Sequence, residues 1–172
     1  MDFIGRDLFT APLQTTLHQF EEADNFGSLI RPELTDVQAV LQLLEAKDVS
    51  GQLFLSETHK KVLQALRQAD YLSPRYHVVV ANPPYMGGKG MNGRLKVWLG
   101  ENYPVSKSDL MTCFMEQSSN LIKNGGFWAM INLPSWMFLG SYADLRELLV
   151  RKQCVQSLLH LGRGLFGPDF GT

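Results

Sequence analysis

The sequence predicts an α/β protein in which parallel strands, joined by helical crossovers, follow a mostly helical segment. Two observations carry this prediction. Apolar residues recur at helical spacing in residues 1–72, whereas residues 76–81 form a short β-branched run typical of a buried parallel strand. From residue 76 onward the pattern is strand, helix, strand, helix, strand, which indicates a parallel sheet. We therefore expect two domains, 1–72 and 73–172.

The helical domain is expected to contain three helices. The first spans roughly 13–23. The second is capped by Thr35 and extends through Leu44, with apolar residues on one face. The third covers about 53–69. These helices are interpreted as packing elements, since no residue pattern in them indicates chemistry.

The sheet domain begins with the strand at 76–81, which two prolines stop because proline cannot continue a central strand. Residues 86–107 are glycine-rich and predict a long loop, and loops of that length are usually functional or mobile. A helix over 109–123 should follow, capped by Ser108 and ended by the Asn-Gly-Gly at 124–126. The remaining elements are expected to be a strand at 127–133, a helix from 141 or 142 to 152, a strand at 155–161 and a terminal loop.

Composition excludes several classes of protein. The chain is 45% hydrophobic and 19% charged, as in ordinary soluble globular proteins. No apolar run reaches the roughly 20 residues that span a bilayer, and the N-terminus does not have the pattern of a secretory signal. We therefore expect a cytoplasmic protein without a membrane partner. The two cysteines and four histidines are scattered, so a metal site is not expected.

Charge is distributed unevenly along the chain. Residues 1–75 hold eleven acidic and seven basic side chains, whereas residues 76–172 hold six and nine. Four of those nine basic residues lie between 86 and 107, with a single acidic residue among them. A basic stretch beside a site suits an anionic substrate. A solvated surface loop explains the same charges equally well.

The tetrapeptide Asn82-Pro83-Pro84-Tyr85 follows the first strand, where ligands of parallel sheets bind. The exocyclic amine of adenine is a poor nucleophile because its lone pair is delocalised into the ring. The Asn82 side-chain oxygen and the Pro83 carbonyl could accept its two N–H groups and free that lone pair. Successive prolines make the turn rigid and remove competing donors. Tyr85 could stack on a base rotated out of the duplex. An ordinary packing turn is the competing interpretation.

The segment YHVVVANPPY resembles the catalytic motif of amino-methyltransferases, (Asp/Asn/Ser)-Pro-Pro-(Tyr/Phe/Trp). The stretch after residue 107 is similar to adenine methyltransferases of restriction-type systems, with an Asp-Leu helix, a Lys-x-Gly-Gly turn, Pro-x-x-Trp and a Leu-Arg-x-x-Leu helix. The insert MGGKGMNG most resembles the PglX methyltransferases of BREX phage-defence systems. The specific motifs cover about residues 71–172, and residues 1–70 match the same proteins more loosely.

The resemblance implies a partial Rossmann-like methyltransferase sheet and transfer of a methyl group from S-adenosylmethionine to the exocyclic nitrogen of adenine in double-stranded DNA. It makes Asn82 and Pro83 the acceptors, Pro84 the residue that holds the turn's shape, and Tyr85 the stacking residue. Phe114 would contact the cofactor's adenine, although its spacing fits a core residue better. Lys89 and Arg94 could contact phosphate, with a solvated surface role about equally expected.

The chain lacks several parts of this family's pattern: the cofactor-binding turn, a final strand with a second base-stacking aromatic, and a target-recognition domain. The glycine-rich turn and acidic residue that bind the cofactor belong upstream of the tetrapeptide, and residues 1–75 hold only three isolated glycines. The chain is therefore expected to be an internal piece of a longer enzyme, inactive alone, prone to self-association and partnered by other subunits of a defence complex. Methyltransferases of RNA bases or protein glutamine, and a non-catalytic interaction module, remain alternatives. A phosphate-loop NTPase is excluded, because Gly90 follows Lys89 where Ser or Thr is required.

Overall fold

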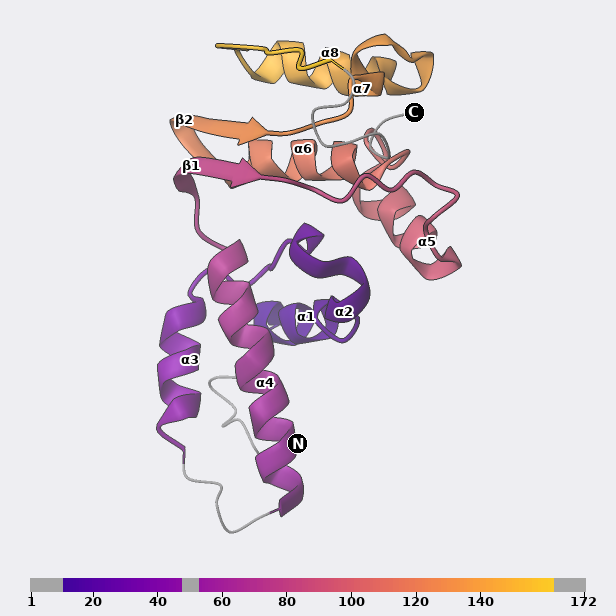
Figure 1. Cartoon of the computed structure of the whole chain (residues 1–172). Coiled ribbons are helices and arrows are strands. Elements are labelled where there is room, and N and C mark those ends of the chain that lie inside the picture. The colour runs from indigo at the N-terminus through magenta and orange to yellow at the C-terminus, as the bar shows by residue number, and fades with distance from the viewer. Residues whose placement is uncertain (1–10, 48–52, 163–172) are drawn as a thin grey trace. The chain divides into compact units, whose positions relative to one another are not determined.

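The computed structural model describes residues 11–47 and 53–162, which divide into two compact units, Met1–Arg75 and Tyr76–Thr172 (Figure 1). Together they make a mixed α/β chain, as the sequence predicts. Among the described residues, no helix combines the length and the apolar character that crossing a bilayer requires.

The first unit is helical throughout its described part. It contains α1 (Ala11–Gln19), α2 (Ala23–Phe26), a 3-10 turn η1 (Gly27–Leu29), α3 (Val37–Glu45) and the long α4 (Leu53–Leu72). Helix α4 packs against both α1 and α3. The expected helices at 37–44 and 53–69 are confirmed, whereas the one expected at 13–23 is interrupted after Gln19.

Buried apolar side chains and a few buried hydrogen bonds hold this unit together. The His59 ring on α4 bonds the Leu44 carbonyl at 2.8 Å, which fixes the end of α3 to α4. The Ser73 hydroxyl donates to the Leu34 carbonyl at 3.0 Å. These contacts join segments that are distant in sequence: α3 to α4 through His59, and the residue that follows α4 to Leu34 through Ser73. Side chains that line the core include Leu13, Phe20, Phe26, Leu29, Ile30, Leu34, Val37, Leu44, Leu66 and Ala69.

The cap of α3 differs from the prediction. Asp36, not Thr35, is the N-cap residue, and its side chain accepts a hydrogen bond from the Ala39 N–H at 3.3 Å. Both residue types can cap a helix. The choice depends on where the backbone turns, and here the turn begins one residue later than the sequence pattern indicated.

The second unit contains a two-stranded parallel sheet of β1 (Tyr76–Ala81) and β2 (Ile122–Met130). Its helices are α5 (Gly93–Asn102), α6 (Leu110–Leu121), α7 (Ser135–Phe138) and α8 (Ala143–Lys152), with a 3-10 turn η2 (Gly140–Tyr142) before α8. The strand–helix–strand order, the parallel pairing and the helix at 143–152 confirm the prediction. The predicted loop at 86–107 is wrong in part, because α5 forms inside it.

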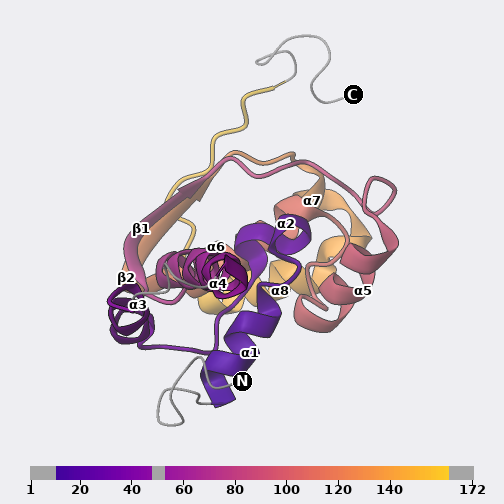
Figure 2. The ribbon, with the colours of Figure 1, turned by 90° about the horizontal axis from the view of Figure 1, so that it is seen from below.

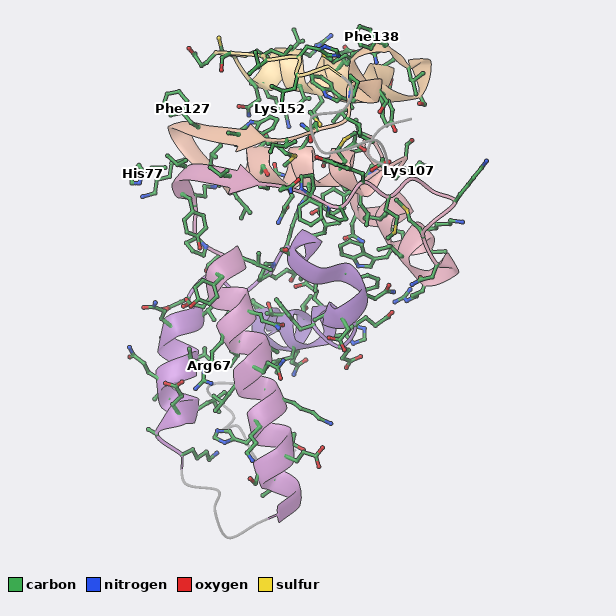
Figure 3. The ribbon with its side chains drawn as sticks, viewed as in Figure 1. Arg67, His77, Lys107, Phe127, Phe138 and Lys152 are labelled. Atoms are coloured by element: carbon green, nitrogen blue, oxygen red, sulfur yellow. The ribbon has the colours of Figure 1, made fainter. Side chains whose placement is uncertain are left out.

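Helices α6 and α8 cover the same face of the sheet (Figures 1 and 2). Met115 of α6, Leu145 and Leu149 of α8, and Trp128 and Met130 of β2 meet in one apolar cluster. The next residues along each strand point to the other side, since side chains alternate between the faces of a sheet. That opposite face is apolar and open: Val78, Val80, Phe127 and Ile131 are 60%, 75%, 59% and 41% exposed. Figure 3 labels Phe127 on β2.

The junction between α6 and β2 also differs from the prediction. Helix α6 ends at Leu121 and β2 begins at Ile122, so the Asn-Gly-Gly at 124–126 lies inside the strand and does not end the helix. The strand pairs Tyr76 with Ile122 but Val78 with Phe127, so β2 bulges between these points. Gly125 has φ +75°, a backbone conformation that glycine adopts readily.

The predicted strand at 155–161 is wrong. The chain forms neither helix nor strand from Gln153 to Gly162, and Val155, Leu158 and Leu159 are 64%, 57% and 81% exposed. A strand needs a neighbouring strand to satisfy its backbone groups, and within the described residues no strand pairs with this run. An apolar, β-branched composition indicates a preference for a strand but cannot supply the partner.

Candidate functional site

The tetrapeptide at residues 82–85 lies where the carboxyl ends of β1 and β2 meet. Ala81 pairs with Met130 at the end of the sheet, and the Ile131 N–H continues the ladder by donating to the Ala81 carbonyl at 3.4 Å. Pro83 is buried, whereas Asn82 is exposed. The turn is therefore anchored through a proline and presents the asparagine side chain to solvent. It does so at the carboxyl ends of the strands, where parallel sheets generally bind their ligands.

Tyr85 ties the turn to the second strand. Its hydroxyl lies 3.0 Å from the Ile131 carbonyl oxygen and 3.3 Å from Oδ1 of Asn82. Burial raises the pKa of Tyr85 above its usual value of 10.0, so the hydroxyl keeps its proton at neutral pH. The first and last residues of the tetrapeptide are thus joined to each other and to the end of β2.

A second anchor follows directly after the tetrapeptide. The Met86 carbonyl accepts the Leu110 N–H at 3.0 Å, and Gly87 forms an antiparallel bridge with Asp109. Asp109 is buried and caps α6, its side chain accepting the Met111 N–H at 2.9 Å. The predicted cap, Ser108, is therefore wrong by one residue. With β1 before it and this bridge after it, the tetrapeptide is held at both ends.

Phe114 lies in the second turn of α6. It is half-buried, and its two sequence neighbours, Cys113 and Met115, are fully buried. Part of the aromatic ring is thus in the core and part is accessible. Both interpretations of this residue fit that position, so its contact with a cofactor stays a prediction.

The two basic residues lie beyond the tetrapeptide on exposed surface. Lys89 lies in a turn that the Gly90 N–H closes by donating to the Gly87 carbonyl at 2.9 Å. Arg94 lies in the first turn of α5, whose N-cap, Asn92, accepts the Leu95 N–H at 2.8 Å. Both side chains are open to solvent, as contact with phosphate requires, but exposure alone also fits an ordinary surface.

Cysteine and histidine chemistry gives no alternative site in the described part of the chain. No group of three or more His, Cys, Asp or Glu side chains there is arranged to hold a metal ion. Burial raises the pKa of Cys113 to about 12, so its thiol is not an active nucleophile at neutral pH. Cys154 is exposed and forms no disulfide.

Sequence reasoning missed two polar groups at the site. The first is the Ile131 carbonyl, which belongs to the backbone and is invisible in a residue pattern. The second is Asn132, whose Oδ1 is shielded from solvent and has no hydrogen-bond partner in the described structure. Asn132 follows the apolar end of β2 and stands two residues before Pro134. This position of a polar residue is the signal in the sequence that could have identified it.

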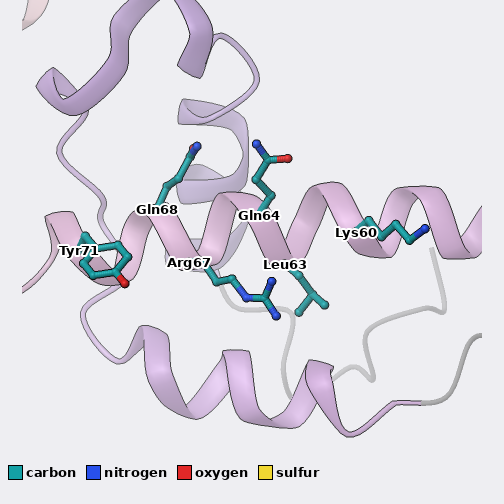
Figure 4. Close-up of a pocket in the computed structure, with 6 residues that line it drawn as sticks. All are labelled: Lys60, Leu63, Gln64, Arg67, Gln68 and Tyr71. Carbon is teal, nitrogen blue, oxygen red and sulfur yellow. The ribbon is translucent and has the colours of Figure 1, made fainter.

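A shallow depression on α4 belongs to the helical unit and contains no residue of the tetrapeptide (Figure 4). Arg67, one of its lining residues, forms an ion pair with Glu45 at 2.8 Å between largely exposed side chains. Such pairs contribute little to stability. The depression is lined by Lys60, Leu63, Gln64, Arg67, Gln68 and Tyr71.

Comparison with known proteins identifies similar sequences. The Eco57I restriction-modification methylase family matches residues 14–166, which include most of the helical unit as well as the tetrapeptide. The adenine-specific methyltransferase BrxX of Escherichia coli O9:H4 (strain HS) is 42% identical over 162 residues. The adenine-specific methyltransferase PglX of Lacticaseibacillus casei (strain Zhang) is 32% identical over 169 residues. These alignments cover 92% and 94% of this chain but only 13% and 14% of the two relatives.

Proposed function

Since the chain belongs to the Eco57I restriction-modification methylase family, we propose that it forms the base-capturing part of an adenine-specific DNA methyltransferase. The observation that supports this most is the Asn-Pro-Pro-Tyr turn, anchored at both ends beside the carboxyl ends of two parallel strands. The names of the two relatives, both adenine-specific methyltransferases, agree with this assignment.

In the proposed reaction the adenine is rotated out of the duplex and its exocyclic amine enters the turn. Asn82 Oδ1 and the Pro83 carbonyl accept the two N–H groups, which localises the nitrogen lone pair. Pro84 keeps the backbone in place and Tyr85 stacks on the base, a contact worth roughly 1–3 kcal/mol. The amine would then form a bond to the methyl carbon as that carbon's bond to the sulfonium sulfur of the donor breaks, so that a neutral thioether leaves, and the proton that the amine loses would pass to solvent.

S-adenosylmethionine, which is a sulfonium cation, would supply the methyl group. Of the described residues, Phe114 is the one we propose to contact this cofactor, through the accessible part of its ring. The family binds this cofactor with a glycine-rich turn and an acidic residue that follow its first strands, and residues 1–75 contain no glycine-rich turn, only three isolated glycines. We propose that the turn and the acidic residue lie in another part of a longer polypeptide, and that this chain does not methylate DNA alone. The small share of the relatives that it covers supports this.

The two strands would then be the centre of a larger Rossmann-like sheet. The open apolar face formed by Val78, Val80, Phe127 and Ile131 supports this, because faces of parallel sheets are normally covered on both sides. Lys89 and Arg94 would contact phosphates of double-stranded DNA. The setting we propose is phage defence or restriction-modification, in which other subunits of a defence complex could bind the longer enzyme.

A methyl-transfer assay with three substrates tests the proposed function. The longer polypeptide is incubated with methyl-labelled S-adenosylmethionine and, separately, duplex DNA, RNA and a glutamine-containing protein extract. We expect label in DNA, at the exocyclic nitrogen of adenine, and loss of that label with Asn82→Ala. Label in RNA or protein, with none in DNA, would replace the DNA assignment with one of the alternatives.

A further inference from the structure

The hydroxyl of Tyr85 has one proton but two acceptors within reach. The Ile131 carbonyl oxygen lies 3.0 Å away and Oδ1 of Asn82 lies 3.3 Å away. Hydrogen bonds between oxygens are about 2.5–3.0 Å long, so the contact to Ile131 lies at the long end of that range and the contact to Asn82 lies beyond it. Because a phenol can donate a single proton, the two acceptors compete for it, and the nearer one is Ile131.

This competition bears on the amide of Asn82. With Oδ1 toward Tyr85, only the NH₂ group of Asn82 would be left to face an adenine amine in the proposed site, and an NH₂ group cannot accept a hydrogen bond from an amine. A half-turn of the amide exchanges its oxygen and nitrogen with almost no change of shape. The nitrogen then donates to the Tyr85 hydroxyl, whose own proton goes to Ile131, and all three groups are satisfied.

We propose that Tyr85 is a positioning residue for Asn82: its hydroxyl, fixed by the Ile131 carbonyl, accepts the Asn82 amide N–H and so turns Oδ1 toward the adenine amine. The inference rests on the proposed function and adds to it a role for the hydroxyl that is separate from stacking by the ring. The role requires a protonated hydroxyl, which can donate and accept at once, and a tyrosine hydroxyl carries its proton at neutral pH.

Two substitutions separate this role from stacking. Tyr85→Phe keeps an aromatic ring that can stack and removes only the hydroxyl. Asn82→Asp replaces the amide with a carboxylate, whose two oxygens are equivalent, so no orientation has to be set. If the hydroxyl acts by orienting the amide, its removal matters with asparagine at position 82 and not with aspartate.

The test is a double-mutant cycle in the longer polypeptide. The substrate is an unmethylated duplex that contains the DNA site which the enzyme methylates. We expect Tyr85→Phe alone to lower the single-turnover methylation rate by about 3- to 10-fold, the range of one net hydrogen bond. The DNA concentration for half-maximal rate should stay within about 2-fold of wild type, because phosphate contacts dominate DNA affinity. In the Asn82→Asp background the same substitution should change the rate by less than about 2-fold.

A binding measurement keeps the test decisive if Asn82→Asp does not turn over. The preference for adenine over purine, which lacks the exocyclic amine, is measured at the target position. Tyr85→Phe should reduce this preference in the wild-type background and leave it unchanged with Asn82→Asp. Tyr71→Phe, which removes a hydroxyl in the helical unit, serves as the matched control and should change neither quantity.

The outcomes distinguish this inference from the proposed function. An active wild-type enzyme that is indifferent to Tyr85→Phe, or that suffers the same loss in both backgrounds, overturns the positioning role and leaves the adenine chemistry intact. A wild-type enzyme without any preference for adenine contradicts the proposed function itself.

Discussion

Gly126 controls the pairing of the two strands that carry the site, and its replacement by alanine should weaken the sheet. A Cβ at this position would lie 2.9 Å from the His77 carbonyl oxygen, 3.0 Å from that of Lys123 and 3.1 Å from that of Tyr76. All three are backbone atoms, two on β1 and one, that of Lys123, on β2 itself, so relief requires the backbone of both strands to shift at the bulge. Overpacking of this kind typically costs about 1–3 kcal/mol.

The effect can be measured by urea unfolding followed through tryptophan fluorescence. The three tryptophans of the chain, Trp98, Trp128 and Trp136, all belong to the sheet unit, so the signal reports on that unit. With a slope of about 2 kcal/mol per molar urea, the expected loss lowers the midpoint by roughly 0.5–1.5 M. The register of β1 against β2 also places Ile131 beside the tetrapeptide, so the weakened pairing should disturb the site.

Gly100→Ala is the matched control. Gly100 lies within α5 and a Cβ there would meet no atom within 4 Å. Alanine in a helix is about 0.5–1 kcal/mol more favourable than glycine, so this variant should be slightly more stable than wild type. If Gly126→Ala unfolds at the wild-type midpoint, or shifts in the same direction as Gly100→Ala, the argument from the three carbonyl contacts is refuted.

Three further predictions follow from caps, thiols and the open sheet face. Because Asp109 caps α6, Asp109→Ala should destabilise the sheet unit by about 1–2 kcal/mol in the same urea assay. Ser108→Ala should destabilise it by less than about 0.5 kcal/mol. Equal effects of the two substitutions would contradict the assignment of Asp109 as the cap. A thiol reagent at pH 8 should modify Cys154 rapidly and Cys113 only in denaturant, because the reagent can reach the exposed Cys154 whereas Cys113 is buried and burial raises its pKa to about 12; equal rates in the folded protein would contradict this. Because the pKa of Cys113 is raised from 9.0 to about 12 by burial, its contribution to the free energy of unfolding should be complete below pH 9 and should fall as the pH rises from 9 toward 12. Cys113→Ala should reduce this dependence of the unfolding free energy on pH. The isolated chain should self-associate in sedimentation velocity experiments through its open apolar face and sheet edges, and a stable monomer at high concentration would refute this.

Local signals in the sequence identify the elements that depend on local physics. The β-branched run at 76–81, the helical spacing of 53–69 and the helix expected from 141 or 142 to 152 each correspond to an element of the structure. Helix α5 was missed because its glycines favour a loop, whereas packing of Leu95 and Leu99 in the interior stabilises a helix there. A pattern read over about ten residues cannot predict packing between distant parts of the chain.

The errors at element ends have a common physical origin. Asp36 and Asp109 cap helices where Thr35 and Ser108 were expected, and each error is one residue. Capping depends on which residue adopts the non-helical backbone angles, and adjacent polar residues do not reveal this. The strand expected at 155–161 failed for a different reason, since its pairing partner is not among the described strands.

The position of the tetrapeptide could be predicted from the sequence, whereas its hydrogen bonds could not. The tetrapeptide and its place after a parallel strand followed from sequence alone. The bond from Tyr85 to the Ile131 carbonyl joins residues 46 positions apart and involves a backbone oxygen, so it emerges only from the folded chain. The proposed positioning of Asn82 depends on that contact.

The most direct test of the central claim is the methylation state of DNA from cells that express the longer polypeptide. The DNA is digested to nucleosides and analysed by mass spectrometry, beside DNA from cells with Asn82→Ala and from cells without the gene. Adenine methylated at its exocyclic nitrogen should appear with the wild-type protein and fall to background with Asn82→Ala. Unmethylated DNA from cells that express a folded wild-type protein, or methylation that survives Asn82→Ala, would contradict the account.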